Sequence, residues 1–193
     1  MNLIILVSSG YYNTEFCGSE DIYGLIHEEA MLSCVNPSAS EEKSLIISEI
    51  IEIEKEYNLP DSMKGLAVSA ACKESRFNPK ARGDRKFSKK NRPKAVGLYQ
   101  MWPWWENKNP GHGVDRENVS QTTRAFLSHI SKQIPKVRKV CKFKTEERVW
   151  IAAWVHAIRA PKKGGRCNQR PKHLRVLRAW RRSIKKLCEF GGC

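Results

Sequence analysis

The chain has 193 residues, of which 40% are apolar and 28% are charged. A chain of this length and composition can bury a sizeable core in one domain, or in one domain with an appendage, which excludes a disordered or low-complexity protein. No apolar run approaches the roughly 20 residues that a membrane-spanning helix needs.

The net charge of +15 is unevenly distributed. Residues 1–62 hold twelve Asp or Glu and two Lys, a net charge of −10, whereas the other 131 residues hold 33 Lys or Arg and eight acids, a net charge of +25. A field of this strength attracts polyanions such as nucleic acid, anionic lipid surfaces or acidic wall polymers. Charge alone does not choose among them, and a high net charge also simply keeps a protein soluble.

The chain contains seven cysteines but no Cys-x-x-Cys pair, and its histidines do not fall at zinc-ligand spacings, so no metal site is expected. Seven cysteines in a chain of this size favour an oxidising compartment, although in a reducing one all would be free thiols. Cys72 lies on an apolar helix face and is interpreted as a plain buried thiol. The spacing leaves the pairing open among the others: Cys17, Cys34, Cys141, Cys167, Cys188 and Cys193.

Residues 1–38 are predicted to form an N-terminal extension, and residues 39–193 the main domain. The apolar stretch from Leu3 to Val7, followed by small residues, is similar to the tail of a secretory signal, although it is short and no Lys or Arg precedes it. A short helix is expected near Ile22–Leu32. Ser38 and Glu41 then have the spacing of a capping box, which predicts the start of a long amphipathic helix.

The rest of the chain is predicted to be helical, with loops between the helices. A helix starting at Pro60 or Asp61 should run to about Ser75, before a basic loop over residues 79–96. Further helices are expected from Asn118 or Ser120 to about Ile134, over Glu146–Ile158 and over Pro171–Leu187. No segment alternates as a strand does, so the fold class is mainly α.

Glu74 is the first candidate for chemistry, because it lies at the end of an apolar helix. The negative end of the helix dipole and the apolar surroundings both disfavour a charged carboxylate there. A carboxylic acid that stays protonated can donate its proton to a leaving oxygen, as the cleavage of a glycosidic bond requires. Taken alone, however, an exposed Glu paired with Lys73 or Arg76 explains the pattern more simply.

The surrounding motifs favour the chemical interpretation. Glu74-Ser75-x-Phe-Asn-Pro-x-Ala, a loop, and then Ala-Val-Gly97-Leu98-Tyr99-Gln100 resemble the signature of the soluble lytic transglycosylase and goose-type lysozyme superfamily. The lead-in "IISEIIEIEKEYNLPDSMKGLAVSAACKES" and the later "ENVSQTTRAFLSHI" and "AAWVHA" are also similar to that superfamily, over about Ser44 to Ala160. The resemblance implies a lysozyme-like helical domain that cleaves peptidoglycan.

The same resemblance implies roles for individual residues. Glu74 matches the general acid, and Ser75 would steady the site by hydrogen bonding. Gly97 would let the backbone approach the sugar, and Gln100 would bind substrate or hold the turn. The remaining positions expected at the substrate are Leu98, Tyr99 as a sugar-stacking ring in place of the usual Met, and one or more of Trp102, Trp104 and Trp105.

The chain departs from the family pattern near its later helix. Trp154 stands where the family has a Tyr whose hydroxyl orients the acid, and its indole N–H would have to donate instead. Val155 replaces a polar Asn, and the neighbouring His156 is a candidate to compensate, or is simply a core histidine. The loop between Ala81 and Ala95 is also longer than usual in the family. These departures leave open a catalytically inactive relative that only binds murein.

Asp84 decides the type of reaction. An inverting hydrolase of the goose type needs a second carboxylate that activates a water, whereas a lytic transglycosylase needs only one acid. Asp84 is similar to the Asp of goose-type lysozymes, but at a different offset, and it also fits a turn residue paired with Arg82 or Arg85. The single-acid interpretation is favoured. No cofactor is implied.

The sequence therefore predicts a secreted, periplasmic or wall-associated enzyme whose partners are peptidoglycan glycan strands and, through its basic body, anionic wall polymers. The basic C-terminal helix has eleven Lys or Arg and no acid between Lys162 and Lys186. It suits such polymers or nucleic acid, or is a solvated face over a core stripe. A basic nucleic-acid-binding protein is the remote alternative, resting on the +25 body and its interleaved aromatic residues.

Overall fold

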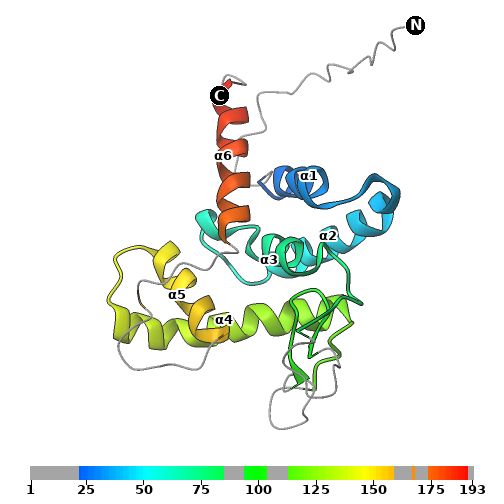
Figure 1. The fold of residues 1–193 in the computed structure, drawn as a ribbon. Coiled ribbons are helices and arrows are strands. Elements are labelled where there is room, and N and C mark those ends of the chain that lie inside the picture. Colours follow the sequence, from blue (N-terminus) through cyan, green and yellow to red (C-terminus); the bar gives the residue numbers. More distant parts are fainter. Residues whose placement is uncertain (1–21, 85–93, 104–112, 159–166, 168–173, 191–193) are drawn as a thin grey trace, which may run out of the picture.

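A computed structural model describes residues 22–84, 94–103, 113–158, 167 and 174–190, with side chains omitted at 155–158 and 187–190. The described part is mainly helical, as the sequence predicts (Figure 1). The suggested export segment, half of the basic loop (residues 85–93) and the residues Trp104 and Trp105 lie outside the described ranges. No described helix is long and apolar enough to cross a membrane.

Six α-helices account for most of the described residues. They are α1 (Ile22–Cys34), α2 (Ser40–Lys55), α3 (Leu66–Ser75), α4 (Val119–Cys141), α5 (Glu146–Ile158) and α6 (Leu174–Phe190). Single 3-10 turns, Pro37–Ala39 and Asp61–Met63, precede α2 and α3. The short strands β1 (Arg82–Gly83) and β2 (Ala95–Val96) form an antiparallel pair.

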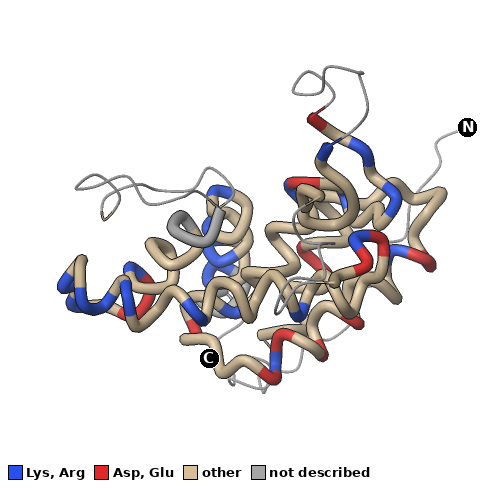
Figure 2. Tube along the Cα trace, turned by 90° about the horizontal axis from the view of Figure 1, so that it is seen from below, with Lys and Arg blue, Asp and Glu red and all other residues tan. Residues whose placement is uncertain are grey.

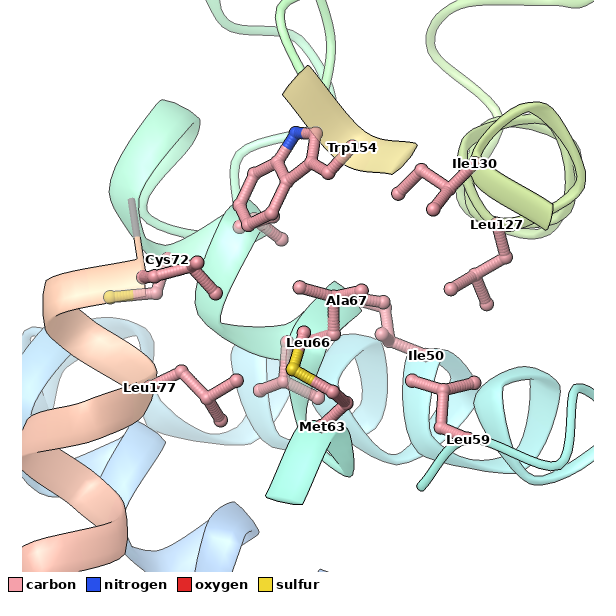
Figure 3. Close-up of a cluster of buried hydrophobic side chains, with 14 of the residues drawn as sticks. Ile50, Leu59, Met63, Leu66, Ala67, Cys72, Leu127, Ile130, Trp154 and Leu177 are labelled. Carbon is pink, nitrogen blue, oxygen red and sulfur yellow. The ribbon is translucent and has the colours of Figure 1, made fainter. Parts of the chain in front are cut away.

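Helix α3 is the centre of the core, and seven consecutive residues, Leu66–Cys72, are buried. Helices α1, α2, α4 and α6 all pack against it. Figure 3 shows Trp154 of α5, Ile130 of α4 and Leu177 of α6 pointing toward α3 from different sides. A helix whose whole circumference is buried is held in position by its neighbours, so the residues at its C-terminal end have a defined location.

Two predicted helix starts are wrong, and both for local reasons. Ser38 does not cap α2: it lies in the 3-10 turn, where the side chain of Asn36 accepts a hydrogen bond from the Ser38 N–H at 3.2 Å. Helix α2 begins two residues later, without a side-chain cap. Helix α3 begins at Leu66 rather than at Pro60 or Asp61, because Gly65, with φ of +87°, separates it from the preceding 3-10 turn.

Helix α4 also departs from the prediction, because it continues past Pro135 to Cys141 instead of ending near Ile134. A proline inside a helix removes one backbone hydrogen bond. The apolar face nevertheless continues across it, since Ile130 before the proline and Val137 after it are both buried. Packing of this face offsets the lost bond and keeps the helix intact. By contrast, the predicted bounds of α5 are confirmed.

The interpretation of Cys72 as a plain thiol is wrong. Cys72 forms a disulfide with Cys34, whose Cα atom lies 5.8 Å away, and this bond ties α3 to α1. A second disulfide joins Cys141 at the end of α4 to Cys167. The spacing of the cysteines did not reveal either pair, because α1 and α3 meet only once the chain has folded around α2.

Candidate active site

Glu74 lies in the last turn of α3 and is half-buried. The chain turns sharply after Ser75, because Arg76 and Phe77 both adopt left-handed backbone conformations, with φ of 52° and 59°. The turn is fixed by the fully buried Phe77 ring and by Lys43 of α2, whose ammonium donates to the Phe77 carbonyl oxygen at 2.7 Å. Glu74 is therefore attached to a rigid helix end. The described contact of the Ser75 hydroxyl is local, a 3.0 Å bond to the carbonyl of Ala71.

The glycine turn packs directly on the segment that follows Glu74. The Gly97 N–H donates to the Ala81 carbonyl at 3.0 Å. A Cβ atom at Gly97 would lie 3.5 Å from the Pro79 carbonyl oxygen and only 1.8 Å from that of Arg116. Gly97, with φ of +81°, is thus required for a close backbone approach. The sequence predicted such an approach toward a sugar, whereas the neighbour that the structure shows is the Arg116 backbone.

Gln100 holds this turn, which was one of its two predicted roles. Its side-chain amide donates to the Gly97 carbonyl at 3.0 Å, and its own φ is 48°. Arg116 is a contributor that the sequence analysis missed. Its buried guanidinium donates to the carbonyls of Lys94, at 2.8 Å, and Met101, at 2.9 Å, on either side of the turn. Arg116 lies in a loop without periodicity, so no pattern marked it.

Leu98 and Tyr99 are core residues, which corrects the expectation of a sugar-stacking Tyr99 ring. Leu98 is 1% exposed and Tyr99 is 8% exposed. The Tyr99 ring stacks on Phe126 of α4 with centroids 4.4 Å apart, and its hydroxyl lies 3.0 Å from the Thr123 hydroxyl. Burial raises the pKa of the Tyr99 phenol well above its usual value, so it stays protonated. Tyr99 therefore anchors the turn to α4.

Asp84 and Trp102 form a pair at the edge of the small sheet. The Trp102 indole N–H donates to the Asp84 carboxylate at 3.0 Å, and the Lys94 ammonium lies 5.3 Å from the centroid of the Trp102 ring. The alternative that Asp84 pairs with Arg82 is wrong, because Arg82 bonds to Glu117 instead. Trp102 is 37% exposed, so part of its indole remains accessible to a ligand.

Trp154 is fully buried and belongs to an aromatic chain that joins three parts of the molecule. Its ring meets Phe126 edge-on at a centroid distance of 5.7 Å, and Phe126 in turn stacks on Tyr99 of the glycine turn. Figure 3 shows Trp154 lying beside α3. The aromatic chain thus couples α5, α4 and the turn. The side chain of His156 lies outside the described residues.

A buried acid at the other end of α3 was also missed. Glu54 of α2 is completely buried, and its carboxylate accepts hydrogen bonds from the backbone N–H groups of Gly65 and, at 2.7 Å, of Ala67. Burial raises the pKa of Glu54 to about 7, against the opposing effect of these two bonds. Tyr23 of α1 also bonds to it, and Arg181 of α6 attracts its charge. In the sequence Glu54 is one of several acids along α2, so nothing distinguished it.

The structure therefore joins the segment Pro79–Asp84, which follows Glu74 along the chain, to the turn Gly97–Gln100, and α4 and Arg116 brace this unit. Among the described residues no group of three or more His, Cys, Asp or Glu is placed to hold a metal ion. Comparison with family models, curated proteins and solved structures found no match to this chain.

Proposed function

We propose that this protein is a peptidoglycan-cleaving muramidase of the lytic transglycosylase type, with a lysozyme-like helical domain. It would cut the β-1,4 bond between N-acetylmuramic acid and N-acetylglucosamine. The main support is that Glu74 lies in the last turn of a helix whose residues Leu66–Cys72 are buried, and that the glycine turn is bonded to the segment following this helix, at Ala81. An acid on a rigid helix end, beside a braced turn, suits proton donation to a bound polymer.

The chemistry requires one acid and no cofactor. Glu74 in its protonated form donates its proton to the glycosidic oxygen, and the bond from that oxygen to the anomeric carbon of the muramic acid breaks. The resulting Glu74 carboxylate then accepts the proton of the same sugar's 6-hydroxyl group. The 6-oxygen attacks the anomeric carbon and closes an anhydro ring, while Glu74 returns to its protonated form.

Replacing Glu74 with Gln tests the proposal. The amide cannot donate a proton as an acid does, so release of soluble fragments from purified sacculi should fall at least about 100-fold. Glu49→Gln is the matched control, because Glu49 is an exposed acid on α2. Circular dichroism should show both variants folded. Undiminished fragment release by folded Glu74→Gln would overturn the proposal, and sacculus binding by the wild type without any release would identify the inactive relative.

The hydrolase alternative depends on Asp84. The carboxylate of Asp84 accepts a hydrogen bond from Trp102, which supports a positioning role at the sheet edge over activation of water. We therefore expect Asp84→Asn to retain at least about half of the activity and the products to carry anhydro ends, measured by mass spectrometry of the digest. Reducing ends together with a loss as large as that of Glu74→Gln would establish the goose-type hydrolase instead.

The proposed location is outside the cytoplasm, in the secreted, periplasmic or wall-associated space where murein lies. The two disulfides support an oxidising compartment. Nucleic-acid binding remains the remote alternative. It predicts tight binding to DNA or RNA with a steep dependence on salt and no effect of Glu74→Gln.

A further inference from the structure

The two halves of α4 differ in what their side chains contact. Its N-terminal half supports the candidate site, since Thr123 and Phe126 contact Tyr99 of the glycine turn. Its C-terminal half carries Lys132, Lys136 and Lys139, all exposed. Because these lysines are spaced by four and three residues, they lie on one face of the helix. Figure 1 shows α4 running along one edge of the molecule, away from the turn.

Further exposed cations follow the end of the helix. We call the whole set the α4 lysine surface, and it consists of the exposed residues Lys132, Lys136, Lys139, Lys142, Lys144 and Arg148. From Val119 to Arg148 there are eight Lys or Arg and two acids, a net charge of +6. Figure 2 shows blue positions gathered at this end of the trace, while most red positions lie toward the other side.

The two nearby acids do not neutralise this surface. Glu146 pairs with Arg138 at 2.8 Å, and Glu147 pairs with Arg178 at 3.3 Å. None of the six cations of the α4 lysine surface forms a salt bridge with any acid in the described part of the chain. Like charges this close repel one another, and a bound polyanion relieves the repulsion.

Helix α6, for which polymer binding was one of the alternatives that the sequence left open, uses part of its charge in contacts within the protein. Arg178 forms the bridge to Glu147 of α5. Arg181 donates to the backbone carbonyls of Asp61 and, at 2.9 Å, of Lys64, at the entrance to α3. These two arginines hold α6 against the core. The described cations of α6 are thus divided between internal contacts and exposed positions, whereas all six cations of the α4 lysine surface are exposed.

We propose that the α4 lysine surface binds the phosphodiester backbone of an anionic polymer carried by the wall. Lysine is a flexible point charge that neutralises phosphates without demanding a particular geometry, and five of the six cations are lysines. The aromatic residue between them, Phe143, packs against the core. A surface without a stacking platform suits a saturated phosphodiester chain better than single-stranded nucleic acid, whose bases stack on exposed aromatic rings.

The choice of a wall polymer as the ligand rests on the proposed function. The lysines of α4 and the α4 residues that contact the glycine turn lie on the same helix, at a defined separation. Thr123 and Lys139 are sixteen residues apart on α4, which corresponds to about 24 Å along the helix axis. A polymer bound at the lysines would thus lie beside, and not inside, the site near Glu74. It would hold the enzyme on the wall while the glycan strand is cut.

The test measures binding of the full chain to a soluble poly(glycerol phosphate) and to sacculi with and without their phosphopolymers. The triple variant Lys132→Gln, Lys136→Gln, Lys139→Gln should bind the polymer about tenfold more weakly. Its slope of log affinity against log salt should be shallower by about two. The matched control is Arg175→Gln, Arg182→Gln, Lys186→Gln, three exposed cations of α6. It removes the same charge and should lose less than half of the affinity.

Three results would overturn the inference. The first is an equal loss of polymer affinity in both triple variants. The second is wild-type binding to sacculi that does not change when their phosphopolymer is removed. The third is tighter binding of the wild type to duplex DNA than to the polymer at equal phosphate concentration. A measurement of fragment release from sacculi without phosphopolymer distinguishes failure of this inference from failure of the proposed function. Polymer binding without fragment release would reject the enzyme and leave the binding surface, and fragment release without polymer binding would do the reverse.

Discussion

At the scale of single residues, Gly97 shows how a backbone contact determines which residue is allowed. Its left-handed φ of +81° already disfavours a side chain, and a Cβ atom would lie 1.8 Å from the Arg116 carbonyl oxygen. That neighbour is backbone and cannot rotate away. The position therefore carries two independent penalties, one conformational and one steric.

We expect Gly97→Ala to lower the free energy of unfolding by about 3 kcal/mol or more, since left-handed backbone alone costs about 1–2 kcal/mol for a residue with a Cβ. The measurement is urea denaturation followed by circular dichroism. Gly113→Ala is the control: Gly113 has φ of +79°, but a Cβ atom added there would have no described atom within 4 Å. If the two variants lost the same stability, the contact with Arg116 would have no role.

Residue identity also misleads at this scale. The sequence suggested Tyr99 for sugar stacking, and Asp84 either as a water-activating base or as a turn residue paired with an arginine. The structure buries Tyr99 against Phe126 and pairs Asp84 with Trp102. An aromatic ring or a carboxylate suits several roles equally well, and only its neighbours decide among them. Glu74 as the general acid stays a prediction that the variants described above test.

At the scale of elements, α3 is held at its N-terminus by a buried acid and carries the candidate acid at its C-terminus. The Glu54 carboxylate accepts hydrogen bonds from the backbone N–H groups of Gly65 and Ala67, because N–H groups at a helix start have no partner within the helix. Tyr23 of α1 hydrogen-bonds to Glu54 and Arg181 of α6 attracts its charge, while Asp61 acts in turn on Tyr23. The position of α3 therefore depends on α1, α2 and α6 together.

The raised pKa of Glu54 predicts a pH dependence of stability. The pKa of Glu54 is about 7 in the folded protein, whereas its ordinary value, which applies to the unfolded chain, is 4.5. The folded state therefore binds the proton more tightly than the unfolded state. The stabilisation that proton binding at Glu54 gives to the folded protein is fully present below about pH 4.5 and is lost as the pH rises through 7. It amounts to about 3 kcal/mol.

The variant Glu54→Gln isolates this contribution, because Gln does not titrate. The difference in unfolding free energy between wild type and Glu54→Gln should shift by about 3 kcal/mol between pH 4.5 and pH 8, with the wild type losing relative stability at high pH. Urea titrations at a series of pH values provide the measurement. A difference that stays constant over this range would mean that Glu54 has an unshifted pKa.

At the scale of the whole molecule, the Cys34–Cys72 disulfide joins residues 38 positions apart and fastens the first helix to the central one. It lines a pocket of about 530 Å³ between α1, α3 and α6, so a small reductant can reach it. Cross-linking two distant residues stabilises a fold mainly by restricting the unfolded chain.

Replacing both cysteines in Cys34→Ser, Cys72→Ser should cost about 2–4 kcal/mol of unfolding free energy. Thermal or urea denaturation measures the loss, with and without a phosphine reductant. The reductant should then destabilise the wild type more than the double variant, in which only the Cys141–Cys167 bond remains of the two described. Equal sensitivity would show that the Cys34–Cys72 bond contributes nothing measurable.

The sequence by itself determined the helical class, the bounds of α5 and the place of Glu74 at the end of an apolar helix, because hydrophobic periodicity and breaker residues act over a few neighbouring positions. Only the tertiary structure decided the partner of Cys72, the neighbour of Gly97, the burial of Tyr99 and the role of Glu54. Each of these depends on which distant segments meet, and contacts of that kind arise from the packing of α1, α2, α4 and α6 around α3, which no local spacing encodes.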